Sequence, residues 1–191
     1  MKKILVGFFI ALSVFAHAAK DLAKLNTLKF DAEERQSING KEKLLKYKVT
    51  IEFPNKIKKE MTFPEMNKGE IYVYDGEIKQ IYLPIFDEYK ETKVENEENK
   101  IIQTINKIRN LKDTSKIKQE YQNKKLKTLY IDEKKKELIN IKEYMDVSEY
   151  IFPKSIEVKE GDIKLGTILI DNVEINPSLE KEEFKINKGK K

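Results

Sequence analysis

The chain has 191 residues, with 38 basic and 33 acidic side chains, no cysteine and one histidine, His17. The lack of cysteine excludes a disulfide framework and a thiol nucleophile. The formal net charge of +5 is small, and lysines alternate with glutamates instead of forming a basic stripe, so the composition argues against nucleic-acid binding.

The first 18 residues have the pattern of a cleavable secretory signal peptide. Lys2 and Lys3 precede an apolar stretch at residues 4–15, and a small-x-small triplet follows at residues 16–18. The apolar stretch is too short to span a bilayer. We therefore expect a soluble periplasmic protein in which residues 19–191 form a single domain.

Residues 20–36 predict a short N-terminal helix that runs into a strand. Leu22, Leu25 and Leu28 recur at every third position, which places them on one helical face. Asn39-Gly40 then predicts a turn.

Residues 45–84 predict consecutive antiparallel strands. Apolar side chains alternate with lysine, threonine and glutamate from Leu45 to Phe53, which is the two-residue period of a strand with one buried and one solvated face. Pro54-Asn55 ends this run and a weaker alternation follows. Asp75-Gly76 predicts a tight hairpin between the next two strands.

An acidic, unpatterned stretch at residues 91–100 precedes the clearest amphipathic helix of the chain, at residues 101–111. Residues 117–175 return to strand and turn patterns, with a break at Phe152-Pro153, and Phe184 predicts a short edge strand. Nine or ten strands with one or two helices predict a mainly β (α+β) fold, in which the helices lie on the concave side of a curved antiparallel sheet.

The apolar strand faces are the main candidate site. A long curved sheet with so little helix leaves part of its concavity unfilled, and an apolar concavity suits a lipid chain or another hydrophobic guest. The alternative is that the same side chains form only the core. The predicted wall consists of Tyr47, Val49, Ile51, Phe53, Ile71, Val73, Ile81 and Leu83. Ile101, Ile105 and Ile108 predict either a mobile lid or an ordinary packed helix.

No enzyme, metal or cofactor site is predicted. His17 leaves with the signal peptide, so zinc sites and catalytic groups built from histidine or cysteine are excluded from the domain. Adjacent acids such as Asp87 and Glu88 point to opposite faces of a strand and do not indicate a catalytic dyad. Asp162 and Asp171 lack the loop of a calcium site.

Short motifs along most of the chain resemble the LolA family of periplasmic lipoprotein carriers. They are residues 30–36 (FDAEERQ), Phe53-Pro54-Asn55, Tyr74-Asp75-Gly76, residues 81–84 (IYLP), Phe152-Pro153, residues 171–177 (DNVEINP) and Phe184. The resemblance implies an incomplete β-barrel with a helical lid, which holds the acyl chains of lipoproteins and carries them from an inner-membrane donor to an outer-membrane acceptor. One departure is Phe53, which stands where the best-known members have an arginine that helps to close the lid.

Two functions remain open at this point. The first is a monomeric periplasmic carrier, or chaperone, for acylated lipoproteins or another lipid. The second is an envelope lipid-binding or regulatory sensor module on the same fold, in which the sheet binds another protein.

Overall fold

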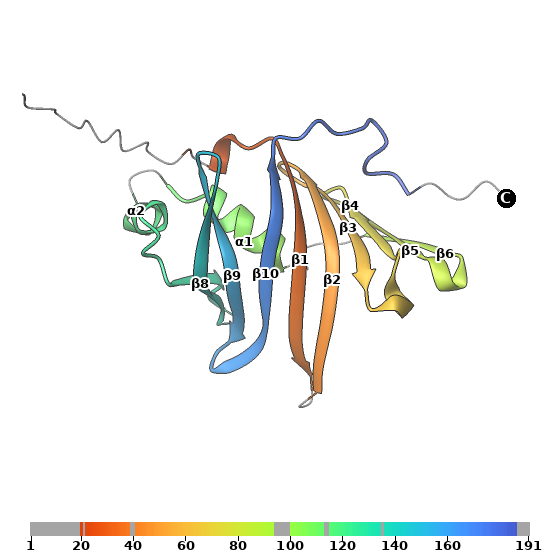
Figure 1. Cartoon of the computed structure of the whole chain (residues 1–191), viewed down its shortest axis with the longest axis horizontal. Helices are drawn as coiled ribbons and strands as arrows, with labels where there is room; N and C mark the ends of the chain where they lie inside the picture. The colour runs from red at the N-terminus through yellow and green to blue at the C-terminus, as the bar shows by residue number, and fades with distance from the viewer. Residues whose placement is uncertain are drawn as a thin grey trace, which may run out of the picture.

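A computed structural model describes residues 20, 22–38, 41–93, 100–112, 115–134 and 136–186. The expected signal peptide (residues 1–18) and the expected turn at Asn39-Gly40 lie outside the described residues. The described residues form one antiparallel sheet of ten strands in the order β6-β5-β4-β3-β2-β1-β10-β9-β8-β7, which leaves the sheet open between β6 and β7 (Figure 1). This confirms the mainly β fold that the sequence predicts.

The strands are β1 (Thr27–Ile38), β2 (Lys41–Glu52), β3 (Lys56–Phe63), β4 (Ile71–Tyr74), β5 (Ile78–Leu83), β6 (Glu88–Lys93), β7 (Thr128–Asp132), β8 (Glu137–Val147), β9 (Tyr150–Glu160) and β10 (Ile163–Ile175). The described helices are α1 (Lys100–Arg109) and α2 (Lys116–Gln122), with 3-10 turns η1 (Leu22–Lys24), η2 (Glu65–Asn67) and η3 (Pro84–Phe86).

The core lies between one face of the sheet, here called the inner face, and the helix α1. In Figure 1 the sheet is seen from its other side, the outer face, and α1 lies behind β9 and β10. Ile102, Ile105 and Ile108 on α1 are at most 3% exposed. They pack in one cluster with residues of β1, β2, β8, β9 and β10, and the cluster residues of β1, β2, β8 and β10 recur at every second position.

The pairing of β1 with β10 joins the N-terminal and C-terminal halves of the sheet. Ala32 lies opposite Ile170, and Gln36 lies opposite Gly166. A Cβ atom at Gly166 would come within 2.4 Å of the carbonyl oxygen of Arg35. Glycine is therefore required where the two strands approach each other.

The hairpin between β4 and β5 forms where the sequence predicts it. Asp75 accepts hydrogen bonds through Oδ1 from the backbone N–H groups of Glu77 and Ile78, at 3.3 and 3.0 Å. Gly76 has a φ of +100°, a conformation that favours glycine. The Asp-Gly pair thus supplies both the side-chain acceptor and the backbone freedom that the turn needs.

Two segments differ from the structure expected. The helix predicted to begin residues 20–36 is reduced to η1, and the strand predicted to follow it begins already at Thr27, where β1 pairs with a neighbour along both edges. Conversely, α2 stands where the second block of strands was expected to begin. Ser115 caps α2 by accepting a hydrogen bond from the N–H of Lys118 at 3.1 Å, a local signal that the strand prediction missed.

Two predictions about the C-terminal half are also wrong. Phe152-Pro153 does not separate strands: Pro153 lies within β9 and pairs with Tyr144, beside an irregularity in β8 that tolerates a residue without an N–H. Phe184 lies in a turn and not in an edge strand, and its ring lies 5.8 Å from the Nζ atom of Lys56. The segment of residues 176–186 instead crosses the outer face.

Candidate functional site

The strand register fixes which side chains share the inner face. Residues that pair directly across antiparallel strands lie on the same face. Val49 on β2 pairs with Lys59, Lys59 with Tyr72, and Tyr72 with Ile81 on β5. The next row runs in the same way from Ile51 to Ile57, Tyr74 and Lys79.

Six of the eight predicted wall residues lie on the inner face or at its end. Tyr47, Val49 and Ile51 are buried within the core cluster, and Phe53 packs against it, half-buried, just beyond β2. Ile81 and Leu83 are half-buried on β5, and the core cluster of the described residues includes neither.

Ile71 and Val73 lie on the outer face, because they pair with Glu60 and Lys58. Tyr72 and Tyr74 take the inner positions on β4 and are partly buried against the core. The sequence of β4, Ile-Tyr-Val-Tyr, is apolar or aromatic at every position, so its pattern does not show which side chains lie on the inner face.

The predicted lid positions lie on α1, and two of their side chains, Ile105 and Ile108, face the core. Ile105 and Ile108 are 2% and 3% exposed, whereas the side chain of Ile101 and residues 94–99 lie outside the described part of the chain. Ile102, which the prediction did not place in the lid, is buried with them. The covered half of the inner face, under α1, is therefore a filled core.

Arg109, the last residue of α1, holds the helix to the N-terminal turn. Its Nε donates to the carbonyl oxygen of Leu22 at 3.1 Å, and its Nη2 donates to those of Ala23 at 3.2 Å and Leu25 at 3.1 Å. The guanidinium carbon lies 3.7 Å from the centre of the Phe53 ring. Phe53 thus contacts an arginine that comes from the helix, a role that sequence reasoning missed.

Lys59 introduces a positive charge into the inner face. Its Nζ lies 4.2 Å from the centre of the Tyr47 ring and 5.6 Å from that of Tyr72. Burial lowers the pKa of the Lys59 ammonium, and the carboxylate of Glu34 opposes this shift. Burial also raises the pKa of Tyr47, whose hydroxyl donates to Glu34 at 2.8 Å.

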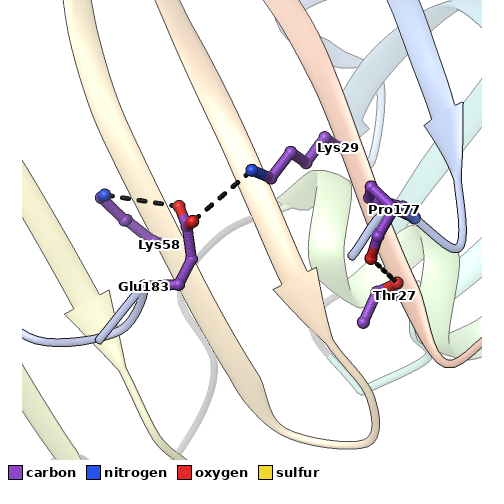
Figure 2. Close-up of polar contacts among 5 residues, drawn as sticks. All are labelled: Thr27, Lys29, Lys58, Pro177 and Glu183. Atoms are coloured by element: carbon purple, nitrogen blue, oxygen red, sulfur yellow. Dashed lines mark hydrogen bonds and ion pairs between the residues drawn. The ribbon is translucent and has the colours of Figure 1, made fainter. Parts of the chain in front are cut away.

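The outer face carries a polar groove of about 320 Å³. Three lysines, Lys29, Lys48 and Lys58, line it together with four acids, Asp31, Glu60, Glu174 and Glu183. Figure 2 shows the carboxylate of Glu183 between Lys29 and Lys58, 3.5 Å from each ammonium, and the hydroxyl of Thr27 donating to the carbonyl oxygen of Pro177 at 2.8 Å. The groove therefore serves to hold the segment of residues 176–186 against the sheet.

Neither a metal site nor a membrane-spanning helix is found in the described part of the chain. No group of three or more histidine, cysteine, aspartate or glutamate side chains there is arranged to hold a metal ion. The helices among the described residues are too short and too polar to cross a bilayer.

Comparison with known proteins gives a match in structure but not in sequence. No protein-family model and no curated protein matches the chain. A LolA superfamily protein from Nitrosomonas europaea superposes with a TM-score of 0.61 at 10% identity, over 86% of this chain and 92% of the other. The sheet has the LolA fold.

Two further structures support the same assignment of the fold. A DUF1329 family protein from Desulfovibrio piger matches with a TM-score of 0.61 at 14% identity, over 86% of this chain and 95% of the other. A domain assigned to outer membrane lipoprotein sorting, from Vibrio parahaemolyticus, matches with a TM-score of 0.58 at 13% identity, over 84% and 89% of the two chains. At these identities the shared property is the fold.

Proposed function

We propose that this protein is a periplasmic carrier that binds the acyl chains of lipoproteins, or another lipid, against the inner face of β3, β4 and β5. The observation that carries the proposal is the uneven cover of the inner face. Under α1 the apolar side chains are fully buried, whereas Tyr72, Tyr74, Ile81 and Leu83 are only partly buried. Partly buried apolar and aromatic side chains on a sheet of this fold form a wall for a hydrophobic guest.

Binding by this wall requires no covalent step. Transfer of an acyl chain from water to an apolar surface is favourable by about 0.8 kcal/mol per methylene group. A chain that covers Ile81 and Leu83 would remove their remaining apolar surface from water. Arg109 and Phe53 fix one end of α1, so their contact would set how far the helix can move when a ligand enters.

The signal pattern of residues 1–18 supports a direction of transport for the proposed carrier. A protein exported to the periplasm would receive its cargo from an inner-membrane donor and deliver it to an outer-membrane acceptor. We expect the chain from residue 19 onward to act as a single domain and as a monomer, without a catalytic group or a cofactor.

The proposal is tested with protein purified from residue 19 onward and a dipalmitoylated cysteine peptide as the probe. We expect native mass spectrometry to detect a one-to-one complex and Ile81→Asn to weaken it. The matched control is Ile163→Asn, at a side chain that is 68% exposed on the β9–β10 hairpin. Absence of any acylated adduct in the unmodified protein would overturn the proposal.

The site of the test variant matters because α1 belongs to the core. Ile105 is 2% exposed, so Ile105→Asp would bury a charge and report on folding rather than on ligand binding. Ile81 is a better position because its side chain is half-buried and lies outside the core cluster of the described residues.

A further inference from the structure

The ammonium of Lys59 is a partly buried charge to which the described residues offer no hydrogen-bond acceptor. It lies beside the rings of Tyr47 and Tyr72, and within the described part of the chain it makes neither a hydrogen bond nor an ion pair. An ammonium group has three N–H donors, and cation–π contacts with two rings do not provide an oxygen acceptor for them. A lysine at an inner position of the sheet is unusual, because lysine side chains are mostly exposed.

The nearest carboxylates are already engaged by the tyrosines. Glu34 accepts hydrogen bonds from the Tyr47 hydroxyl at 2.8 Å and from Nε2 of Gln36 at 2.7 Å. Glu70 accepts hydrogen bonds from the Tyr72 hydroxyl at 2.7 Å and from Nδ2 of Asn67 at 2.6 Å. Both carboxylates therefore orient the rings beside Lys59 without bonding to its ammonium.

Charges of both signs act on Lys59. Glu34 and Glu70 favour its charged form, whereas Lys79 and Lys43 act against it. An oxyanion that reached Lys59 would supply an acceptor for its ammonium.

Lys59 lies on the same face of the sheet as the side chains that we propose to bind the acyl chain. Tyr72 stands between Lys59 and Ile81 in one row of the inner face, and Leu83 follows Ile81 on the same side of β5. Ile81 is two strands away from Lys59, a separation of about 10 Å at the usual strand spacing. An amphiphile can therefore place a charged group at Lys59 while its chain lies over β5.

We propose that the ligand is an acyl compound with an anionic head group, a carboxylate or a phosphate ester, and that Lys59 binds this head group. The inference rests on the proposed function and names the ligand class of the same site. Lys59 then acts as a specificity-determining residue, because an uncharged head group would leave its ammonium without an acceptor.

The test compares palmitic acid with its uncharged methyl ester by fluorescence displacement at low salt. We expect the unmodified protein to prefer the acid by at least about tenfold, the range of a single charge-assisted hydrogen bond. Lys59→Met keeps the apolar stem and should abolish the preference, and Lys59→Arg should restore most of it. The control is Lys154→Met, at an exposed position on β9 whose ammonium is paired with Glu143.

The possible results separate this inference from the proposed function. Equal binding of the acid and the ester by the unmodified protein would overturn the role of Lys59 and leave the carrier proposal standing. Binding of neither probe would overturn both. A third arm uses acetate, which has the carboxylate but no chain. Acetate binding as tight as that of palmitic acid would overturn the assignment of the anion to a lipid head group.

Discussion

The guanidinium of Arg109 stacks on the ring of Phe53 at 3.7 Å, and the same group donates hydrogen bonds to three carbonyl oxygens of the N-terminal turn. The backbone N–H of Phe53 in turn donates to the carbonyl oxygen of Asn26 at 2.8 Å. One arginine thus joins the end of α1, the start of β1 and the end of β2. The family resemblance implies an arginine at position 53, at the end of the strand. This chain has Phe53 there, and the arginine that contacts its ring, Arg109, comes from the helix α1.

Replacement of Arg109 by alanine should loosen α1. Three carbonyl oxygens lose a charged donor, and a hydrogen bond to a charged group contributes about 1.5–3 kcal/mol. The three bonds are exposed or only partly buried, so water can replace the guanidinium and the total loss stays near that of one such bond. We expect the free energy of unfolding to fall by about 2 kcal/mol and the amide hydrogens of α1 to exchange faster than those of β9. Lys107→Ala, at an exposed position on the same helix, is the control and should change neither quantity.

The contact between Arg109 and Phe53 can be measured separately by a double-mutant cycle. Phe53→Leu removes the ring but keeps an apolar side chain. We expect a coupling energy of about 0.5–1 kcal/mol between Arg109→Ala and Phe53→Leu, the range of a partly exposed cation–π contact. Strictly additive effects in chemical denaturation would show that the stacking contributes nothing to stability.

Neutralisation of Glu183 should release the segment of residues 176–186 from the outer face. The Glu183 side chain is 14% exposed and lies between two ammonium groups, so Glu183→Gln removes both ion pairs. Global stability should fall by less than about 1 kcal/mol, as for other surface pairs. Cleavage by trypsin at Lys181 and Lys185 should become several times faster, since local opening controls such cleavage.

Glu182→Gln is the matched control for this experiment. Glu182 pairs with Lys185 at 2.8 Å, within the segment itself, and so does not hold the segment to the sheet. Equal cleavage rates for the two variants would contradict the role that we assign to Glu183.

Replacement of Gly166 by alanine should weaken the seam between β1 and β10. The new Cβ would meet a backbone oxygen, which cannot move away as a flexible side chain can. We expect a loss of about 2 kcal/mol or more in chemical denaturation, in the range of overpacked sites. Thr167→Ala on the same strand is the control, with an expected effect below about 1 kcal/mol. A neutral Gly166→Ala variant would show that the seam can separate without loss.

Buried tyrosines should limit stability at alkaline pH. Burial and the neighbouring Glu34 raise the pKa of Tyr47 well above its ordinary value of 10.0, and burial raises the pKa of Tyr121 in the same direction. Each group favours the folded state below pH 10, and this contribution is lost as the pH rises above 10, because the unfolded chain gives up its proton first. We expect Tyr47→Phe to flatten the alkaline decline in the free energy of unfolding.

The same titration can be followed by the ultraviolet absorbance of tyrosinate. In the folded protein some tyrosines should ionise later than in urea, where all of them ionise near pH 10. Tyr47→Phe should remove one of the late groups. If the folded and unfolded proteins titrated alike, the pKa values of these tyrosines could not be raised.

The sequence by itself determined the elements in which one periodicity dominates. β2 shows strict alternation, α1 shows a helical apolar face, and Asp75-Gly76 shows the chemistry of a tight turn, and all three are present in the structure. Such patterns are local, because each residue's burial depends on its own position along a strand or helix. These local patterns are enough to predict the mainly β fold class and the resemblance to the LolA fold.

Only the tertiary structure decided which residues meet. β1 is a strand and not a helix because it has partners on both edges. The inner positions of β4 belong to Tyr72 and Tyr74 because the register with Lys59 and Ile57 places them there. Arg109 meets Phe53, and Lys59 lies between two tyrosines, through strand register and helix packing. A linear pattern cannot specify these contacts, since a shift of one residue in register moves every side chain to the opposite face.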